Sequence, residues 1–229
     1  MSNRREVLKA FEEQKEYTTE RVNKGIDKNR KGICEITVKD SSGIPVPDVK
    51  ISVTQKTHEF RFGANLFMLE ELETEEKNKL YKKYFADVFN MATLPFYWNG
   101  LEPTPGNRRF AKDSERIYRR PAIDLCIEFC KENGIEPREH CLNYDTWIPD
   151  WLVDEPVSYI KEKLEERMMI LAERYSEDIN CWEVINESLF TRIGEKCSAF
   201  YHEPDFVGWS FDTAAKYFKN NELAINDAQ

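Results

Sequence analysis

The N-terminal part of the chain carries two different patterns of apolar and polar positions. Residues 1–31 are rich in charge, and their sparse apolar positions recur at roughly helical spacing, which predicts a solvated helix lying on the main body. A frayed tail is the alternative. Residues 32–58 then alternate between apolar and polar positions in two runs, 33–38 and 49–54, on either side of a turn sequence at 40–43. This alternation predicts a small antiparallel β element.

Residues 59–229 alternate instead between strand-like and helix-like segments. Short apolar segments predict strands at 60–66, 88–96, 136–142, 179–185 and 223–225. Amphipathic stretches between them predict helices at 71–85, 116–133, 157–175 and 211–219. Gly134 stands where the second of these helices is expected to be capped. Strands that alternate with helices indicate an α/β fold with a parallel sheet and right-handed crossovers, either doubly wound or a (β/α)8 barrel.

The length of this last part favours an incomplete barrel. About 170 residues follow Glu59 and hold the five predicted strands, whereas a complete (β/α)8 barrel takes about 250 residues. The sequence also stops at residues 226–229, directly after a predicted strand. We therefore expect a charged N-terminal helix in 1–31, a small antiparallel β element in 32–58, and a partial TIM-type barrel of about five βα units in 59–229.

Composition and charge restrict the classes of function. The chain has 33 Lys and Arg against 42 Asp and Glu, for a net charge of −9, which argues against a nucleic-acid partner. Charged residues make up 33% of the sequence, and no apolar run is long enough to span a membrane. The first residues lack the apolar core of a secretory signal. We expect a soluble, cytoplasmic protein, with secretion of a longer native product left open.

Several common kinds of site have no counterpart in the sequence. The six cysteines contain no C-x-x-C pair and mostly lie in apolar runs, which predicts free, buried thiols. Cys126 and Cys130 are four residues apart on a predicted helix, but no further His or Cys stands near them to complete a metal site. The sequence also lacks G-x-G-x-x-G, P-loop, G-x-S-x-G and H-E-x-x-H motifs. Nucleotide-binding, serine-hydrolase and zinc-protease functions are therefore disfavoured.

Polar residues gather where the predicted strands end, which is where parallel α/β folds build their sites. The apolar strand at 179–185 ends in Asn186 and Glu187. A carboxyl group at the end of such a strand is partly desolvated, which raises its pKa and suits it to donate a proton near neutral pH. The alternative is a structural role, in which Glu187 caps the next helix or pairs with an arginine such as Arg192.

Two aromatic groups follow the second and third predicted strands. Trp98 begins a polar loop after the second strand, and such a ring beside polar groups suits the stacking of a sugar; the alternative is an ordinary packed aromatic. His140 lies near the end of the third predicted strand and is followed by Tyr144, Asp145 and Trp151, so that polar groups and aromatic rings again stand together. A lone histidine of this kind is also often a hydrogen-bonded structural residue.

In this order, the three groups resemble glycoside hydrolase family 10, the β-1,4-xylanase family of (β/α)8 barrels. The family motifs K-W-D-x-x-E-P, G-H-x-L-V-W-H with a downstream P-x-W, and W-D-V-V-N-E correspond to Trp98 with Glu102-Pro103, to His140 with Pro149 and Trp151, and to residues 182–187. The segment 223–227 is similar to the family's L-Y-Y-N-D strand. The resemblance covers roughly residues 32–229.

The resemblance implies a retaining glycoside hydrolase that needs no metal and no organic cofactor. It would make Glu187 the acid/base catalyst and Asn186 a hydrogen-bond donor to the sugar 2-hydroxyl, and it would place His140 and Trp98 in the wall that holds the glycone. Tyr144, Asp145 and Trp151 would complete the substrate-binding set. The family's nucleophile is a second Glu about 5 Å away on the seventh strand, and no carboxylate in residues 1–229 matches its motif.

Departures from the family pattern concern the substrate. Leu94-Pro95-Phe96-Tyr97 replaces E-N-x-M-K, and Tyr144 and Asp145 replace a tryptophan and a histidine, so a related β-glycan, or a xylan with unusual decoration, would fit as well as plain xylan. Our leading hypothesis is retaining hydrolysis of a β-1,4-linked polysaccharide by a barrel whose nucleophile is missing from this chain. The alternatives are a non-catalytic or vestigial carbohydrate-binding barrel and a barrel completed by a partner chain that supplies the missing strands.

Overall fold

The computed structural model describes residues 4–190 and 198–227. The chain divides into two compact units, Met1–Lys56 and Thr57–Gln229, and the sequence predicts the start of the barrel two residues later, at residue 59. A membrane-spanning segment is not found, since none of the helices in the described ranges has the necessary length and apolar character. The two units are described separately below.

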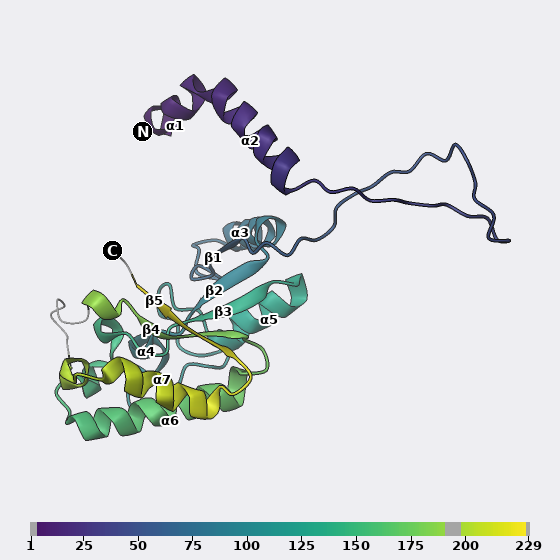
Figure 1. Cartoon of the computed structure of the whole chain (residues 1–229). Coiled ribbons are helices and arrows are strands. Elements are labelled where there is room, and N and C mark those ends of the chain that lie inside the picture. Colours follow the sequence, from purple (N-terminus) through teal and green to yellow (C-terminus); the bar gives the residue numbers. More distant parts are fainter. Residues whose placement is uncertain (1–3, 191–197, 228–229) are drawn as a thin grey trace. The chain divides into compact units, whose positions relative to one another are not determined.

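The N-terminal unit begins with two consecutive helices, α1 (Arg4–Glu13) and α2 (Lys15–Asn29), as the spacing of its apolar residues predicts (Figure 1). No residue of α2 is buried. Pairs of opposite charge four residues apart, such as Lys24 with Glu20 at 2.6 Å, lie along its surface, and each adds only a few tenths of a kcal/mol. Helix α2 therefore depends on local interactions rather than on a core.

The sequence predicts an antiparallel β element in residues 32–58, and this prediction is corrected by the structure. The turn forms, but the two strands do not. The Asp40 carboxylate accepts hydrogen bonds from the backbone N–H groups of Ser42 and Ile44, at 2.9 Å each. Beyond the turn, the two arms are joined by a single bridge between Lys39 and Pro45. An isolated two-stranded ribbon is marginal in water because it has no surface on which to bury one face. Alternation of apolar and polar residues is therefore not enough to form strands in residues 32–58.

The second unit contains one sheet of five parallel strands. The strands follow one another in chain order: β1 (Gly63–Asn65), β2 (Met91–Pro95), β3 (Glu136–His140), β4 (Cys181–Asn186) and β5 (Glu222–Asn226). The first three strands lie within their predicted segments, and β4 and β5 overlap theirs and extend beyond them by one residue, β4 at one end and β5 at both. A sheet in which every strand pairs with its predecessor in the sequence is the arrangement of a (β/α)8 barrel and not of a doubly wound fold, whose order reverses at the first strand.

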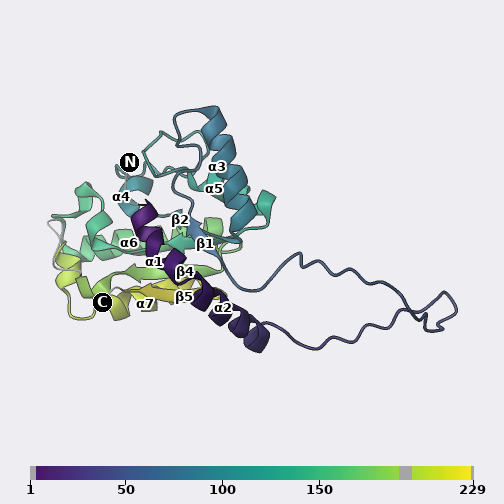
Figure 2. The ribbon, with the colours of Figure 1, turned by 90° about the horizontal axis from the view of Figure 1, so that it is seen from above.

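Helices connect these strands. They are α3 (Glu75–Val88), α4 (Trp98–Leu101), α5 (Ile123–Asn133), α6 (Val157–Tyr175) and α7 (Phe206–Tyr217), with short 3-10 turns η1 (Asp145–Trp147), η2 (Asp150–Leu152), η3 (Ser188–Phe190) and η4 (Ala199–His202). Helices α6 and α7 lie side by side, and α7 packs on β4 and β5. In Figure 2, α3 and α5 lie toward the β1 and β2 end of the sheet and α7 toward the β5 end.

The core of the barrel unit lies between the sheet and these helices. Helix α6 buries Ile160, Leu164, Met168 and Leu171, whose spacing of three or four residues forms one apolar stripe. Trp182 of β4 is fully buried, and its ring lies 4.2 Å from that of Phe218. The thiols of Cys126, Cys130 and Cys141 are buried and free, as predicted, whereas Cys34 is exposed.

Gly134 ends α5 in the left-handed conformation, with φ of 62°, as the sequence predicts for a helix cap. We expect Gly134→Ala to lower the free energy of unfolding by about 1–2 kcal/mol, because a Cβ atom disfavours this conformation. Gly134→Asn should cost less, since asparagine tolerates positive φ. Urea unfolding followed by circular dichroism measures both values. Equal stability of the alanine variant and the unmodified chain would contradict this account.

Candidate active site

The backbone around Glu187 directs its carboxyl group from the tip of β4. Asn186 is the last residue of the strand, and Glu187 follows it with φ of +53°. This left-handed conformation is strained for a residue with a Cβ atom, and such strain clusters at functional sites. The Glu187 N–H donates to the carbonyl of Asn226, at 2.6 Å, and the half-buried carboxylate accepts a hydrogen bond from the Tyr144 hydroxyl.

The neighbouring amide, Asn186, is buried by its position between strands. Its backbone N–H donates to the Asn143 carbonyl at 3.1 Å, and its side-chain oxygen accepts from the Asn226 amide at 2.7 Å. The register pairs Asn186 with Asn226. Adjacent strands therefore hold this amide in a fixed orientation beside Glu187.

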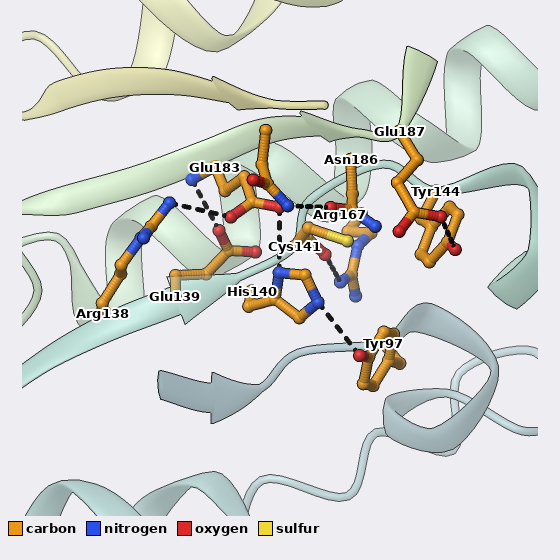
Figure 3. Close-up of polar contacts among 11 residues, drawn as sticks. Tyr97, Arg138, Glu139, His140, Cys141, Tyr144, Arg167, Glu183, Asn186 and Glu187 are labelled. Atoms are coloured by element: carbon orange, nitrogen blue, oxygen red, sulfur yellow. Dashed lines mark hydrogen bonds and ion pairs between the residues drawn. The ribbon is translucent and has the colours of Figure 1, made fainter. Parts of the chain in front are cut away.

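His140 is fixed at both ring nitrogens, as Figure 3 shows. Its Nδ1 lies 2.9 Å from Oε1 of Glu183, and its Nε2 lies 3.0 Å from the Tyr97 hydroxyl. Desolvation raises the pKa of Tyr97 to about 12, which keeps this hydroxyl protonated and able to donate. A neutral imidazole that donates from Nδ1 to the carboxylate then accepts at Nε2 from Tyr97. The sequence left two interpretations of His140 open, a hydrogen-bonded structural residue and a residue that lines the sugar site. The structure shows the hydrogen bonds, and they are compatible with a position in the site.

The Glu183 carboxylate that contacts His140 is itself held by neighbouring polar groups. The Glu183 carboxylate is 2% exposed and pairs with the Arg138 guanidinium at 3.0 Å. The Glu183 N–H donates to Oε2 of Glu139 at 2.9 Å, and Glu139 is fully buried. Burial and the nearby Glu183 charge raise the pKa of Glu139 well above its ordinary value.

Arg167 of α6 joins the ends of two strands. Its guanidinium donates to the carbonyl groups of Leu142, at 3.1 Å, Cys141, at 3.3 Å, and Phe96. Burial lowers the pKa of Arg167 to about 10, so the side chain remains a cation at neutral pH. A helix residue thus satisfies the backbone acceptors that follow β2 and β3. Figure 3 shows Arg167 beside Cys141.

Among the described residues, one group of side chains has the composition of a metal site: His140, Cys141 and Glu183. Their ligand atoms lie within 4.8 Å of one another. Other partners already engage these atoms. Both nitrogens of His140 are hydrogen-bonded, and Arg138 pairs with Glu183. Burial also raises the pKa of the Cys141 thiol well above its ordinary value, which disfavours the thiolate that a metal binds. This donor set is therefore a poor fit to a metal ion.

Trp98 and Trp151 lie in a separate, mostly buried group around Glu102. Trp98 is 4% exposed, and its indole N–H donates to Oε2 of Glu102 at 3.1 Å. The Trp151 indole N–H donates to the Glu102 carbonyl at 3.1 Å. The two indole rings meet edge to face at 6.2 Å. This environment matches the packed-aromatic alternative for Trp98 and gives it little surface for a sugar.

Asp145 is also buried, so the structure places it behind the surface rather than on it. Its Oδ1 accepts a hydrogen bond from the Thr146 N–H at 2.6 Å, while Oδ2 has no hydrogen-bond partner among the described residues. Desolvation raises the pKa of Asp145. The structure therefore groups Glu187, Asn186, Tyr144 and His140. Arg192, named as a structural partner for Glu187, lies outside the described residues.

Tyr97, like the Glu183–Arg138 pair, is a part of this site that the sequence did not single out. Its ring lies 5.1 Å from that of His140, 6.4 Å from that of Tyr144 and 5.1 Å from that of Trp147. Pro95 pairs with His140 in the register of β2 and β3, which brings the residue two positions later close to the histidine. The sequence could have indicated Tyr97 only through the pairing of the second and third predicted strands.

The titration of Glu139 gives a pH-dependent prediction. Because its pKa is raised in the folded chain, the folded state holds a proton that the unfolded state releases above about pH 4.3. Stability should therefore fall as pH rises from this value through the raised pKa. We expect Glu139→Gln to lose less stability over the same range, since its amide does not titrate. Urea unfolding at several pH values tests this, with exposed Glu173→Gln as control; parallel profiles would contradict it.

The sheet order and the acid at the tip of the fourth strand together define an incomplete (β/α)8 barrel, as expected from the sequence. The sequence model of glycosyl hydrolase family 10 matches residues 55–229. The chain belongs to this family, which confirms the resemblance drawn from its motifs.

Curated relatives are similar to large parts of this chain. It is 25% identical over 213 residues to anti-sigma-I factor RsgI6 of Acetivibrio thermocellus, covering 89% of this chain and 26% of that protein. It is 28% identical over 177 residues to endo-1,4-beta-xylanase A of Halalkalibacterium halodurans, covering 69% of this chain and 41% of that protein. The chain therefore spans less than half the length of these relatives.

Solved structures show the same fold. The endo-1,4-beta-xylanase from Caldicellulosiruptor owensensis superposes with a TM-score of 0.57 at 20% sequence identity, covering 73% of this chain and 50% of that chain. A xylanase 10B from Thermotoga maritima gives a TM-score of 0.57, also at 20% identity, and covers 49% of that chain. These matches establish an incomplete TIM-type barrel.

Proposed function

We propose that this chain carries the acid/base half of a retaining glycoside hydrolase that acts on a β-1,4-linked polysaccharide such as xylan. The observation that carries the proposal is the carboxyl group of Glu187. It stands at the tip of β4 on a strained backbone, is half-buried, and is hydrogen-bonded by Tyr144. Membership of the family and relatives named as xylanases support this assignment.

In the proposed reaction, protonated Glu187 gives its proton to the glycosidic oxygen as the bond to the anomeric carbon breaks. A second carboxylate about 5 Å away forms the covalent glycosyl intermediate, and the Glu187 carboxylate then removes a proton from the water that hydrolyses it. The hydroxyl of Tyr144 orients the Glu187 carboxyl group, and Asn186 would bind the sugar 2-hydroxyl. Since no carboxylate of residues 1–229 matches the nucleophile motif, we place that group on a segment outside them.

Titration with sugars tests this proposal directly. We expect the 229-residue chain to bind xylo-oligosaccharides more tightly than cello-oligosaccharides of the same length, as measured by isothermal titration calorimetry. The N-terminal unit, residues 1–56, offers a control fragment that lacks the barrel. Failure to bind either series would overturn the proposal. Preference for cello-oligosaccharides would retain a glycan site but reject xylan as the substrate.

A non-catalytic carbohydrate-binding barrel is the second candidate. One observation favours it: a relative that matches 89% of this chain is named as an anti-sigma-I factor, whereas another that matches 89% is named as an endo-1,4-beta-xylanase. The two candidates differ in a single readout. Binding of xylo-oligosaccharides by the native protein without any release of reducing ends supports the non-catalytic role, whereas release of reducing ends supports hydrolysis.

A partner that completes the barrel is a further part of the proposal. Within the described residues, β1 and β5 each pair with one strand and leave their other edge unpaired. Unpaired strand edges promote association with other chains. We propose that additional strands, from a partner chain or from a longer form of this protein, cover these edges. Light scattering on the 229-residue chain alone should show self-association, and a stable, monodisperse monomer would contradict this.

A further inference from the structure

A cleft adjoins the Glu187 group and includes Tyr97 in its lining. This cleft has a volume of about 410 Å³ and lies among the segments that follow β1 and β2 and the turn η1. Its lining includes the aromatic side chains of Phe67, Tyr97 and Trp147 and the cations Arg119 and Arg120. No Asp or Glu is among the described residues that line it. In a chain whose net charge is −9, a cleft lined only by positive charge needs an explanation.

Arg120 is held over the aromatic rings of this cleft. Its guanidinium carbon lies 4.1 Å from the centre of the Tyr97 ring, 4.8 Å from that of Trp147 and 5.7 Å from that of Phe67. Cations at these distances are attracted to the faces of aromatic rings. The rings fix the position of the charge, but they do not neutralise it.

Neither arginine has a carboxylate partner among the described residues. Nη1 of Arg120 donates to the carbonyl of Arg119 at 2.9 Å, and this is a neutral acceptor. The Arg119 guanidinium lies 6.0 Å from the centre of the Phe67 ring. Burial, together with the repulsion from Arg119, lowers the pKa of Arg120. The first effect shows that the cation is partly desolvated, and a bound anion would relieve both this cost and the repulsion between the two arginines.

The segment that carries the two arginines is tied to its surroundings. Arg109, 3% exposed, donates to the carbonyl groups of Gly100 at 2.6 Å, Glu115 at 2.7 Å and Arg120 at 3.0 Å. A Cβ atom added to Gly100 would come within 3.0 Å of Cγ and Cδ of Arg120. The aliphatic part of Arg120 therefore rests on Gly100, and the cleft is preformed on this side.

We propose that this cleft binds a uronic acid unit of the glycan, with the carboxylate on Arg119 and Arg120 and the sugar ring against the aromatic side chains. The proposal rests on the proposed glycan substrate and names its chemical class: an acidic rather than a neutral β-glycan. Guanidinium groups bind carboxylates through charge-assisted hydrogen bonds, and a cavity of about 410 Å³ falls within the usual range for a small ligand. Because Tyr97 contacts both His140 and Arg120, the acidic unit and the bond held at Glu187 belong to one glycan.

Calorimetry with two matched sugars tests the proposal. The 229-residue chain is titrated with a linear xylo-oligosaccharide and with the same oligosaccharide carrying one glucuronic acid. We expect the acidic sugar to bind at least about tenfold more tightly, the effect of one or two hydrogen bonds to a charged group. We also expect this ratio to shrink as the salt concentration rises from about 0.01 to 1 M, where the Debye length falls from about 30 to 3 Å.

Variants assign the preference to the cleft. Arg120→Gln should bring the two affinities within about twofold of each other, as expected once a specific interaction is lost, and Arg119→Gln should reduce the ratio less. Arg119 is exposed, so its variant is expected to fold even if Arg120→Gln does not; circular dichroism checks both. Lys79→Gln removes the same charge from an exposed position on α3 and should keep the full ratio.

The outcomes separate this inference from the proposed function. Equal binding of the two sugars would overturn the acidic-glycan inference and leave the glycan site in place. A preference that survives both arginine variants would also overturn it, because the carboxylate would then bind elsewhere. Binding of neither sugar would overturn the proposed function and the inference together.

Discussion

Replacing Glu187 with glutamine should lower the hydrolysis of xylan by the native protein about 10²–10⁴-fold, the usual contribution of a general acid or base. The amide has the size of the carboxyl group and still accepts the hydrogen bond from Tyr144, but it has no proton to give to the leaving oxygen. Release of reducing ends measures the change. Affinity for xylo-oligosaccharides should stay within about twofold, since ordinary surface contacts are retained.

Two controls make the result specific for proton donation. Glu173→Gln, the same change at an exposed position on α6, should leave turnover unaltered. An aryl glycoside, whose leaving group departs without protonation, should be affected much less by Glu187→Gln than xylan is. Full activity of the Glu187 variant on xylan would remove this residue from the mechanism.

The largest effect on stability is expected for Arg167→Met. The substitution removes the donors for three carbonyl groups at the ends of β2 and β3, and it removes the larger of the two cationic influences on the buried Glu139, leaving only that of Arg138. Breaking a buried charge network in this way costs about 3–5 kcal/mol. Urea unfolding followed by circular dichroism measures the loss.

Arg174→Met is the matched control for this prediction, because it makes the same change on the same helix. The Arg174 side chain is 43% exposed and pairs with Asp124 at 2.5 Å. Ion pairs in such exposed positions contribute about 0–1 kcal/mol. Similar losses for the two variants would show that burial of Arg167 is not what makes it important.

The sequence predicted the barrel elements well because their signal is local. The stripe of apolar residues on α6 required a buried helix face, and the predicted bounds 157–175 coincide with the observed helix. The strands at 33–38 and 49–54 failed for the opposite reason: alternation indicates which face would be buried, but no surface covers it in this unit. Strand pairing depends on a partner that periodicity does not reveal.

The residues of the candidate site also fall into those that local sequence predicts and those that depend on strand pairing. Asn186, Glu187 and His140 followed from strand ends and family motifs, which are features of the sequence alone. Tyr97 and the ion pair of Glu183 with Arg138 depend on which strands are neighbours and on their register. Trp98 shows the limit most directly, since its sequence position beside Tyr97 does not reveal that one ring faces His140 and the other is buried against Glu102.

The simple order of the sheet has a consequence for biosynthesis. Each strand pairs with the one made just before it, so the sheet can grow strand by strand while the chain leaves the ribosome. Among the five strands, each of β2 to β5 finds a partner that has already been synthesised. Short sequence separation between partners favours rapid folding, and N-terminal parts of a protein generally fold first during synthesis. The carboxylate of Glu187 would then reach its position only after β2 and β3 have already set His140 and Tyr97 in place.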